Sequence, residues 1–252
     1  MSIAHPLNTL LLSAGYGTRL KKIGERTPKG LFKNSKNISI TDMIIGSLQK
    51  VPQVEDWALV SNNRFFHNYQ DYFAQNYPGL KIKMLNDGTD DPKERLGSLG
   101  DLVFVLNKLS WWDKSILVLA SDRTPENIIP HLVKLYNQHP DCFITCVTRQ
   151  SKKMIANRYG CAQLGQDQKI LSFEEKPAQP KSNYQAIPFY IFPQKSLSLL
   201  KKYYQAGKNM DSPGNIIPWL LQHNFPVYAH ITQKTSIDIG NLEDLKKFKS
   251  AR

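Results

Sequence analysis

The chain has 252 residues, of which 41% are hydrophobic and 21% charged, so its composition is that of a folded globular protein and excludes a disordered one. Its 33 Lys and Arg residues outnumber 21 acidic residues, which gives a formal net charge of +12. Such an excess fits a nucleic acid, a small polyanionic ligand or simply a solvated basic surface. Because the basic residues are spread along the chain without a long basic arm, we expect no nucleic-acid partner.

The sequence also disfavours a membrane protein and a disulfide-bonded protein. No hydrophobic run approaches the roughly eighteen residues of a membrane-spanning helix, and the run at 10–12 is too short for the core of a signal peptide. We therefore expect a cytoplasmic protein with no membrane association. The three cysteines, Cys142, Cys146 and Cys161, lack paired spacing and predict reduced thiols, with Cys142 and Cys146 on one face of a strand.

Hydrophobic runs alternate with amphipathic stretches through the first 150 residues. The runs predict strands at 8–14, 56–61, 80–85, 115–122 and 142–148. Helical spacing predicts helices at 40–51, 64–77, 96–109 and 127–139. The alternation indicates an α/β protein with a mostly parallel mixed sheet and helices on both faces, a three-layer α/β/α architecture of Rossmann-like type.

The rhythm changes after Arg149. The sequence predicts a hairpin at 160–177, strands at 184–192 and 226–232, and helices at about 194–204, 215–223 and 241–250. Nothing in this part reads as an independent domain. We therefore predict a single domain over 1–252, with a first half at about 1–150 and a second half at about 151–252 built onto the same sheet.

The first predicted strand ends in the glycine-rich segment "AGYGTRL" at 14–20. A glycine pair after a buried strand lets backbone N–H groups approach phosphate oxygens. A dinucleotide fingerprint is disfavoured because Leu20 replaces its third glycine, and a Walker loop because no Gly-Lys-Ser/Thr follows. Arg19 and Lys29 add a guanidinium fork and a compact charge, which favours a triphosphate. Lys21, Lys22 and Arg26 are interpreted as solvated surface.

The segment "SAGYGTRL…TPKGL" resembles the signature of the sugar-1-phosphate nucleotidyltransferase family. Further segments that resemble the family follow in its order: "LNDGT" with "ERLGSLGDL", "LVLASD", "RYGCAQL" with "FEEKP", "DSPGNIIPWLL", and "IDIGNLEDL". The resemblance covers nearly the whole chain. It implies the nucleotidyltransferase (GT-A-like) version of the Rossmann-like fold, with a nucleotide-binding first half and a sugar-phosphate-binding second half.

The resemblance also implies a reaction in which a nucleoside triphosphate (NTP) and a sugar 1-phosphate give a nucleoside-diphosphate sugar and pyrophosphate. The residues it implies are catalytic Arg19 and Lys29, nucleotide-binding Ala14, Gly15, Gly17, Thr18, Gly97 and Asp101, sugar-phosphate-binding Gly160, Glu175 and Lys176, and metal-binding Asp122 and Asp238 with Mg²⁺. A phosphate monoester is mostly dianionic at neutral pH and needs no general base. This agrees with the scattered positions of the six histidines.

Some positions depart from the family pattern. Ser121 replaces the glycine before the metal-binding Asp, and Arg123 follows that Asp, so either side chain could reshape the site or Arg123 could add a phosphate contact. Ile187-Pro188 replaces an Ala-Gly pair, and Ser236 replaces an aromatic residue. No Gln stands in "LGSLGDL", which disfavours thymine and uracil and leaves guanine or cytosine open.

Other functions compete with this one. A cytidylyltransferase acting on phosphocholine or a polyol phosphate would share the opening loop, but "FEEKP" and the long second half favour a sugar. A noncatalytic nucleotide-sensing relative would lack Arg19, Lys29 or an acid, and none is missing. A metal-dependent glycosyltransferase would need Asp-x-Asp where "SDRTP" stands. A homo-oligomer stays open.

Overall fold

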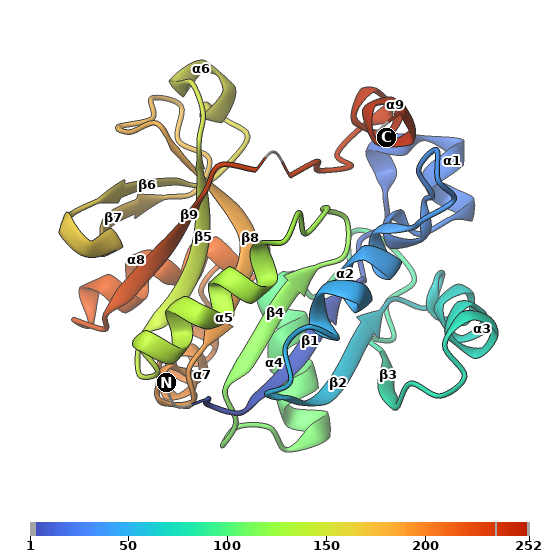
Figure 1. The fold of residues 1–252 in the computed structure, drawn as a ribbon, viewed down its shortest axis with the longest axis horizontal. Helices are drawn as coiled ribbons and strands as arrows, with labels where there is room; N and C mark the ends of the chain where they lie inside the picture. The colour runs from blue at the N-terminus through green and yellow to red at the C-terminus, as the bar shows by residue number, and fades with distance from the viewer. Residues whose placement is uncertain (1–3, 235, 251–252) are drawn as a thin grey trace.

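The computed structural model describes residues 4–234 and 236–250. Within these residues the strands form one nine-stranded mixed sheet in the order β3-β2-β1-β4-β8-β5-β9, and β6 pairs with β7 and β8 (Figure 1). The strands are β1 (Leu7–Leu12), β2 (Val54–Ser61), β3 (Ile82–Asn86), β4 (Ile116–Ala120), β5 (Phe143–Arg149), β6 (Cys161–Leu164), β7 (Ile170–Glu174), β8 (Tyr184–Phe192) and β9 (Val227–Thr232).

Strands β1 to β4 run parallel to one another, as the alternating pattern predicted. Strand β8 lies antiparallel between β4 and β5, and β9 lies parallel to β5, so the sheet is mixed. The central strands β1 and β4 are nearly continuous hydrophobic runs because helices cover both of their faces. Leu12 and Ala120 are register partners, so the chain leaves the carboxyl ends of β1 and β4 side by side.

Helices cover both faces of the sheet and complete the predicted three layers (Figure 1). One core contains side chains of α2 (Ile40–Leu48), α3 (Phe66–Asn76), α5 (Ile128–Gln138) and α9 (Leu242–Ser250). The other contains side chains of α4 (Ser98–Leu109), α7 (Leu197–Gln205) and α8 (Ile216–Gln222). None of the helices in the described ranges is long and hydrophobic enough to cross a membrane.

Several short helices were not predicted from the sequence, because a helix of about one turn is too short to show a hydrophobic periodicity. They are α1 (Lys22–Arg26), α6 (Lys152–Ile155), η1 (Thr18–Leu20), η2 (Lys29–Leu31), η3 (Gln166–Gln168) and η5 (Pro213–Asn215), whereas η4 (Gln194–Ser196) lies within the helix predicted at about 194–204. Cys142 directly precedes β5, and it packs against the same hydrophobic core as Cys146, on one side of the sheet. All three cysteines are free thiols, as predicted.

The segment 236–240 returns from the second half of the chain to the end of β4, as the red trace in Figure 1 shows. Ile239 N–H donates to Asp122 O at 2.9 Å, and Thr124 N–H donates to Ile237 O at 3.0 Å. An isolated antiparallel bridge joins Arg123 to Asp238. These backbone contacts bring Asp238 beside the residues that follow β4.

Candidate active site

A cavity of about 250 Å³ opens at the carboxyl ends of β1 and β4. Sequence-predicted site residues that line it are Ala14, Gly15, Arg19, Lys29, Asp101, Asp122, Lys176 and Asp238. Gly17 and Thr18 line an adjoining cavity of about 160 Å³, which shares Gly15, Arg19 and Lys29 with the first. The structure therefore brings together charged residues that lie up to 219 positions apart, between Arg19 and Asp238.

The glycine loop after β1 is closed by contact between two glycines. Gly17 has a φ of 63°, and a Cβ on Gly24 would lie 2.4 Å from the carbonyl oxygen of Gly17. Ala14 O accepts a hydrogen bond from Asn62 Nδ2 at 2.8 Å, which fixes the start of the loop. Gly15 is exposed and has no atom within 4 Å of the place a Cβ would take, so its backbone is open to a ligand.

Lys29 lies at the start of a tightly packed turn that positions its side chain in the cavity. A Cβ on the next residue, Gly30, would lie 2.8 Å from the Tyr69 hydroxyl and 3.0 Å from Ser121 O, so only glycine fits there. Lys29 Nζ donates a hydrogen bond to Asp122 Oδ2 at 2.9 Å. The opening loop and the end of β4 are thus joined by an ion pair inside the cavity.

Two carboxylates face the cavity with different electrostatics. Burial by itself raises the pKa of Asp122, but the adjacent Lys29 ammonium outweighs it and holds that pKa below its ordinary value. Burial, and then the negative charge of Asp122, raise the pKa of Asp238. The two carboxylates are therefore close enough to repel each other, and a cation bound between them would reduce this repulsion.

This acid pair fits Mg²⁺, which commonly takes one or two carboxylates and completes its shell with water and substrate phosphates. Within 4–234 and 236–250, no three His, Cys, Asp or Glu side chains gather to hold a metal ion by themselves. Asp122 and Asp238 would therefore need oxygen atoms from a substrate to complete the shell.

Arg123, the residue that departs from the family pattern, is buried behind the acids. Its side chain is 2% exposed, and its guanidinium pairs with Asp238 Oδ2 at 3.4 Å. The guanidinium also lies 5.7 Å from the centre of the Tyr159 ring, and its Nε has no hydrogen-bond partner within the described residues. Arg123 is not among the residues that line the cavity, so the alternative of a phosphate contact from Arg123 has no support in this geometry.

Ser121, the other departure next to Asp122, ties two strand ends together. Its hydroxyl donates to Leu12 O at 2.9 Å and accepts from Ser13 Oγ at 2.9 Å. It lines the cavity and is 4% exposed. The serine therefore strengthens the junction of β1 and β4 from which the site is built.

The second half supplies a cation and a buried acid. Lys176 reaches the cavity from a backbone with a φ of 47°, while Glu175 lies behind it and accepts a hydrogen bond from Ser212 Oγ at 3.0 Å. Burial raises the pKa of Glu175. A Cβ on Gly160 would lie 3.0 Å from Glu175 Oε2, so that glycine permits their close approach. Neither Gly160 nor Glu175 lines the cavity.

Sequence analysis missed Arg158, and Gly97, which it expected to bind the nucleotide, lies outside the cavity. Arg158 lines the cavity, and its signal was a cation two residues before Gly160 in "RYGCAQL". Gly97 does not line the cavity, because it packs against the segment 210–211, where a Cβ would lie 2.5 Å from Met210 O. This close contact joins the start of α4 to the segment 210–211.

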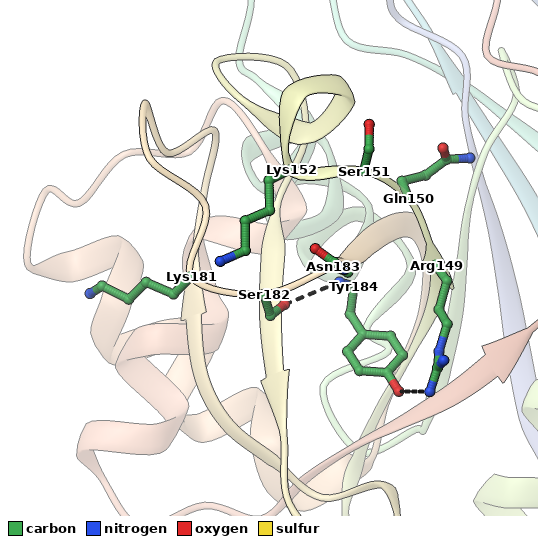
Figure 2. A pocket seen from close by; sticks show the side chains of 8 residues that line it. All are labelled: Arg149, Gln150, Ser151, Lys152, Lys181, Ser182, Asn183 and Tyr184. Atoms are coloured by element: carbon green, nitrogen blue, oxygen red, sulfur yellow. Dashed lines mark hydrogen bonds between the residues drawn. The ribbon is translucent and has the colours of Figure 1, made fainter.

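A larger hollow of about 660 Å³ lies elsewhere, between the loop after β5 and the start of β8, and Figure 2 shows its lining side chains. Arg149 there donates to the Tyr184 hydroxyl at 3.1 Å, and Lys181 is paired with Glu174. No predicted site residue lines this hollow. Most of the charged residues that the sequence predicted converge in the smaller cavity instead.

The sequence model described as Nucleotidyl transferase matches residues 8–251. The chain belongs to this family. It is 37% identical over 248 residues to a glucose-1-phosphate adenylyltransferase of Clostridium novyi, covering 94% of this chain and 64% of that protein. It is 24% identical over 245 residues to a UTP–glucose-1-phosphate uridylyltransferase of Synechocystis, covering 94% of this chain and 61% of that protein.

The chain thus spans less than two thirds of the length of these curated relatives. Among solved structures, a putative glucose-1-phosphate thymidylyltransferase from Bacillus anthracis, in complex with a sucrose, superposes with a TM-score of 0.77 at 17% identity. The match covers 96% of this chain and 94% of that one, and it shows that the two share a fold.

Proposed function

We propose that the chain joins an NTP to a sugar 1-phosphate, releasing pyrophosphate and forming a nucleoside-diphosphate sugar. One observation carries the proposal: Arg19, Lys29 and Lys176 converge with Asp122 and Asp238 on one cavity at the ends of β1 and β4. Ligands of open α/β sheets bind at this edge. Membership of the nucleotidyl transferase family supports the same reaction class.

The triphosphate would lie along the glycine loop. Exposed backbone at Gly15 suits phosphate oxygens, and the exposed side chain of Arg19 suits the β- and γ-phosphates that leave as pyrophosphate. Lys29 would neutralise charge at the α-phosphate and at the attacking oxygen. To do so its ammonium must share or leave Asp122, which it now contacts at 2.9 Å.

Asp122 and Asp238 would hold Mg²⁺ together with substrate phosphates. When bound, this ion would neutralise charge on the phosphates and help to align them for in-line displacement. The chain's own contribution is to hold the two carboxylates, through Arg123 behind Asp238 and Lys29 beside Asp122, at the edge of the cavity.

The sugar phosphate would bind on the side of the cavity that the second half of the chain forms. Lys176 and Arg158 line that side and would hold its phosphate, while Glu175 behind them would accept hydrogen bonds from sugar hydroxyls. One oxygen of the dianionic phosphate forms a bond to the α-phosphorus as the bond to the bridging oxygen breaks, and pyrophosphate takes the electron pair. No proton transfer is needed, so the residues act by positioning and charge.

The relatives named above suggest which acceptor to test first. Their names agree on glucose 1-phosphate and differ in the base, which is adenine, uracil or thymine. We propose glucose 1-phosphate as the first acceptor to test. We retain the expectation of a cytoplasmic enzyme whose partners are its two small substrates, and a homo-oligomer stays open.

The decisive experiment measures pyrophosphate release with Mg²⁺ over five nucleoside triphosphates and a panel of sugar 1-phosphates. We expect one pair to turn over, and Arg19→Ala or Asp122→Ala to lower its kcat/KM by at least about 100-fold through lost charge stabilisation. Absence of release with every pair would remove the proposed reaction. Unchanged rates in both variants would remove the assigned roles.

A further inference from the structure

Tyr69 lines the cavity but has no part in the reaction described above. It lies in α3, is 1% exposed and packs in the hydrophobic core. Among residues 66–76 of this helix, only Tyr69 lines the cavity. Its hydroxyl is therefore the polar group through which α3 can act on the site.

The Tyr69 hydroxyl lies where three segments of the site meet. It is hydrogen-bonded to the side chains of Ser13 and Ser121 and to the backbone of Gly30. The Ser13 hydroxyl donates to Ser121 Oγ, and the Ser121 hydroxyl donates to Leu12 O, both at 2.9 Å. Because both serine protons are used in these bonds, Tyr69 donates its own proton to a serine oxygen. The hydroxyl thus joins the ends of β1 and β4 to η2.

Two of the residues joined in this way are chain neighbours of the ion pair in the cavity. Gly30 directly follows Lys29, and Ser121 directly precedes Asp122. The space between the two backbones is filled: a Cβ on Gly30 would lie 2.8 Å from the Tyr69 hydroxyl and 3.0 Å from Ser121 O. One residue further along each segment, Lys29 Nζ contacts Asp122 Oδ2 at 2.9 Å. The Tyr69 hydroxyl therefore fixes the backbone beside both members of the ion pair.

The site needs such a second connection because the ion pair does not persist in the proposed reaction. With substrates and Mg²⁺ bound, Lys29 would contact phosphate oxygens and Asp122 would contact the cation. The ion pair would then no longer hold the two segments together. The hydrogen bonds of the Tyr69 hydroxyl involve backbone and neutral side chains, so the charges of the substrates do not compete for them.

We infer that Tyr69 is a positioning residue whose hydroxyl keeps Lys29 and Asp122 at a fixed separation while both bind substrate. The inference rests on the proposed function and adds a residue that acts through the charged groups rather than on the phosphates. Turnover depends steeply on such placement, because a shift of about 1 Å can lower a rate by about 100-fold. Loss of the hydroxyl should affect turnover more than binding, because every charge that binds the phosphates remains.

The test compares Tyr69→Phe with Tyr72→Phe in assays of pyrophosphate release. Both variants remove one hydroxyl from α3 and keep the ring. The Tyr72 hydroxyl donates to Asp42, and Tyr72 lines neither cavity of the site. We expect Tyr69→Phe to lower kcat by about 10- to 100-fold and to leave KM for both substrates within about threefold. Tyr72→Phe should keep both parameters within about threefold, although its lost hydrogen bond is to a charged group and is the more costly one for stability.

A second variant tests the same contact from β4. Ser121→Ala removes the serine hydroxyl next to Tyr69 and should also lower kcat. If the two hydroxyls act as one unit, combining Ser121→Ala with Tyr69→Phe should cost little more than the larger single loss. Urea unfolding of each variant reports on the fold. Independent losses that multiply in the double variant would contradict a shared role.

Hydrogen exchange of the substrate-free chain gives a measurement that needs no turnover. We expect the amides at 28–32 to exchange at least about threefold faster in Tyr69→Phe than in the unchanged chain, because the turn that carries Lys29 loses its connection to β1 and β4. Tyr72→Phe should leave exchange at 28–32 unchanged, since its hydroxyl contacts Asp42 instead.

The outcomes separate the inference from the proposed function. An unchanged kcat in Tyr69→Phe, equal losses of kcat in Tyr69→Phe and Tyr72→Phe, or a rise in KM alone overturns the positioning role while the reaction stands. Unchanged exchange at 28–32 overturns the connection itself. Turnover of no substrate pair by the unchanged chain removes the proposed function, and the inference with it.

Discussion

Lys29 Nζ lies 2.9 Å from Asp122 Oδ2, and this ion pair joins a loop and a strand end that are 93 residues apart in the chain. Both partners are half-buried, with side chains 15% and 34% exposed. The pair keeps an unliganded cation and acid compensated at the point where the proposed substrates meet. Binding of the substrate phosphates would give Lys29 a new partner of opposite charge, and binding of Mg²⁺ would do the same for Asp122.

We predict that Lys29→Met lowers kcat/KM for pyrophosphate release by at least about 100-fold, because a charge that acts in the transition state is lost. Lys22→Met is the matched control: Lys22 is exposed in the same basic segment and lines neither cavity of the site. The control should stay within about threefold of the unchanged chain. Similar losses in both variants would mean that general positive charge, rather than position, supports the reaction.

The close packing under Lys29 gives a prediction about stability. Gly30→Ala would place a methyl group 2.8 Å from the Tyr69 hydroxyl and 3.0 Å from Ser121 O. We expect the free energy of unfolding to fall by about 1–3 kcal/mol, as for other overpacked sites. Gly46→Ala in α2 meets no atom within 4 Å and should instead raise it by about 0.5–1 kcal/mol. Urea unfolding of both variants measures the two effects, and equal changes would contradict this account.

Much of the site was predictable because it follows strand ends. Gly15 and Arg19 lie in the loop after β1, and Asp122 lies two residues after β4. Neighbouring parallel strands bring such positions to one edge of the sheet. Asp238 was different: it lies on no strand, and its place depends on backbone bonds between 236–240 and 122–124. Only its resemblance to a family motif predicted it, since local pattern carries no information about such a crossing segment.

The sequence did not predict the direction in which side chains of the candidate site point. Arg123 follows an acid of the site and could equally have faced a phosphate, but it turns inward to Asp238 and the Tyr159 ring. Its direction is decided by contacts with residues more than thirty positions away, such as Ser236, whose carbonyl accepts from Nη1 at 3.4 Å. Glu175 and Gly160 likewise approach each other only through packing around Gly214.

We predict that Arg123→Met destabilises the chain by about 1–3 kcal/mol. Removing one member of a buried pair leaves an uncompensated charge, and the effect is smaller than for a fully enclosed pair because the Asp238 side chain is 29% exposed. Arg123→Met combined with Asp238→Asn removes both charges and should recover most of the loss. A double variant as unstable as the sum of the two single variants would show that the ion pair contributes nothing.

The paired histidines His131 and His230 predict how stability changes with pH. Their rings stack with centroids 5.3 Å apart, and burial, followed by the charge of His131, lowers the pKa of His230 from 6.5 to about 4. The folded state therefore cannot take up a proton that the unfolded state binds below about pH 6.5, so this contribution is complete above that pH and is lost as the pH falls toward 4. Because His230 is partly exposed, we expect a loss of only about 1 kcal/mol between pH 7.5 and 5. Urea unfolding of the unchanged chain and of His230→Gln at both pH values measures the contribution of His230. The variant should lose less stability between pH 7.5 and 5 than the unchanged chain. An equal loss would show that His230 does not contribute to the pH dependence.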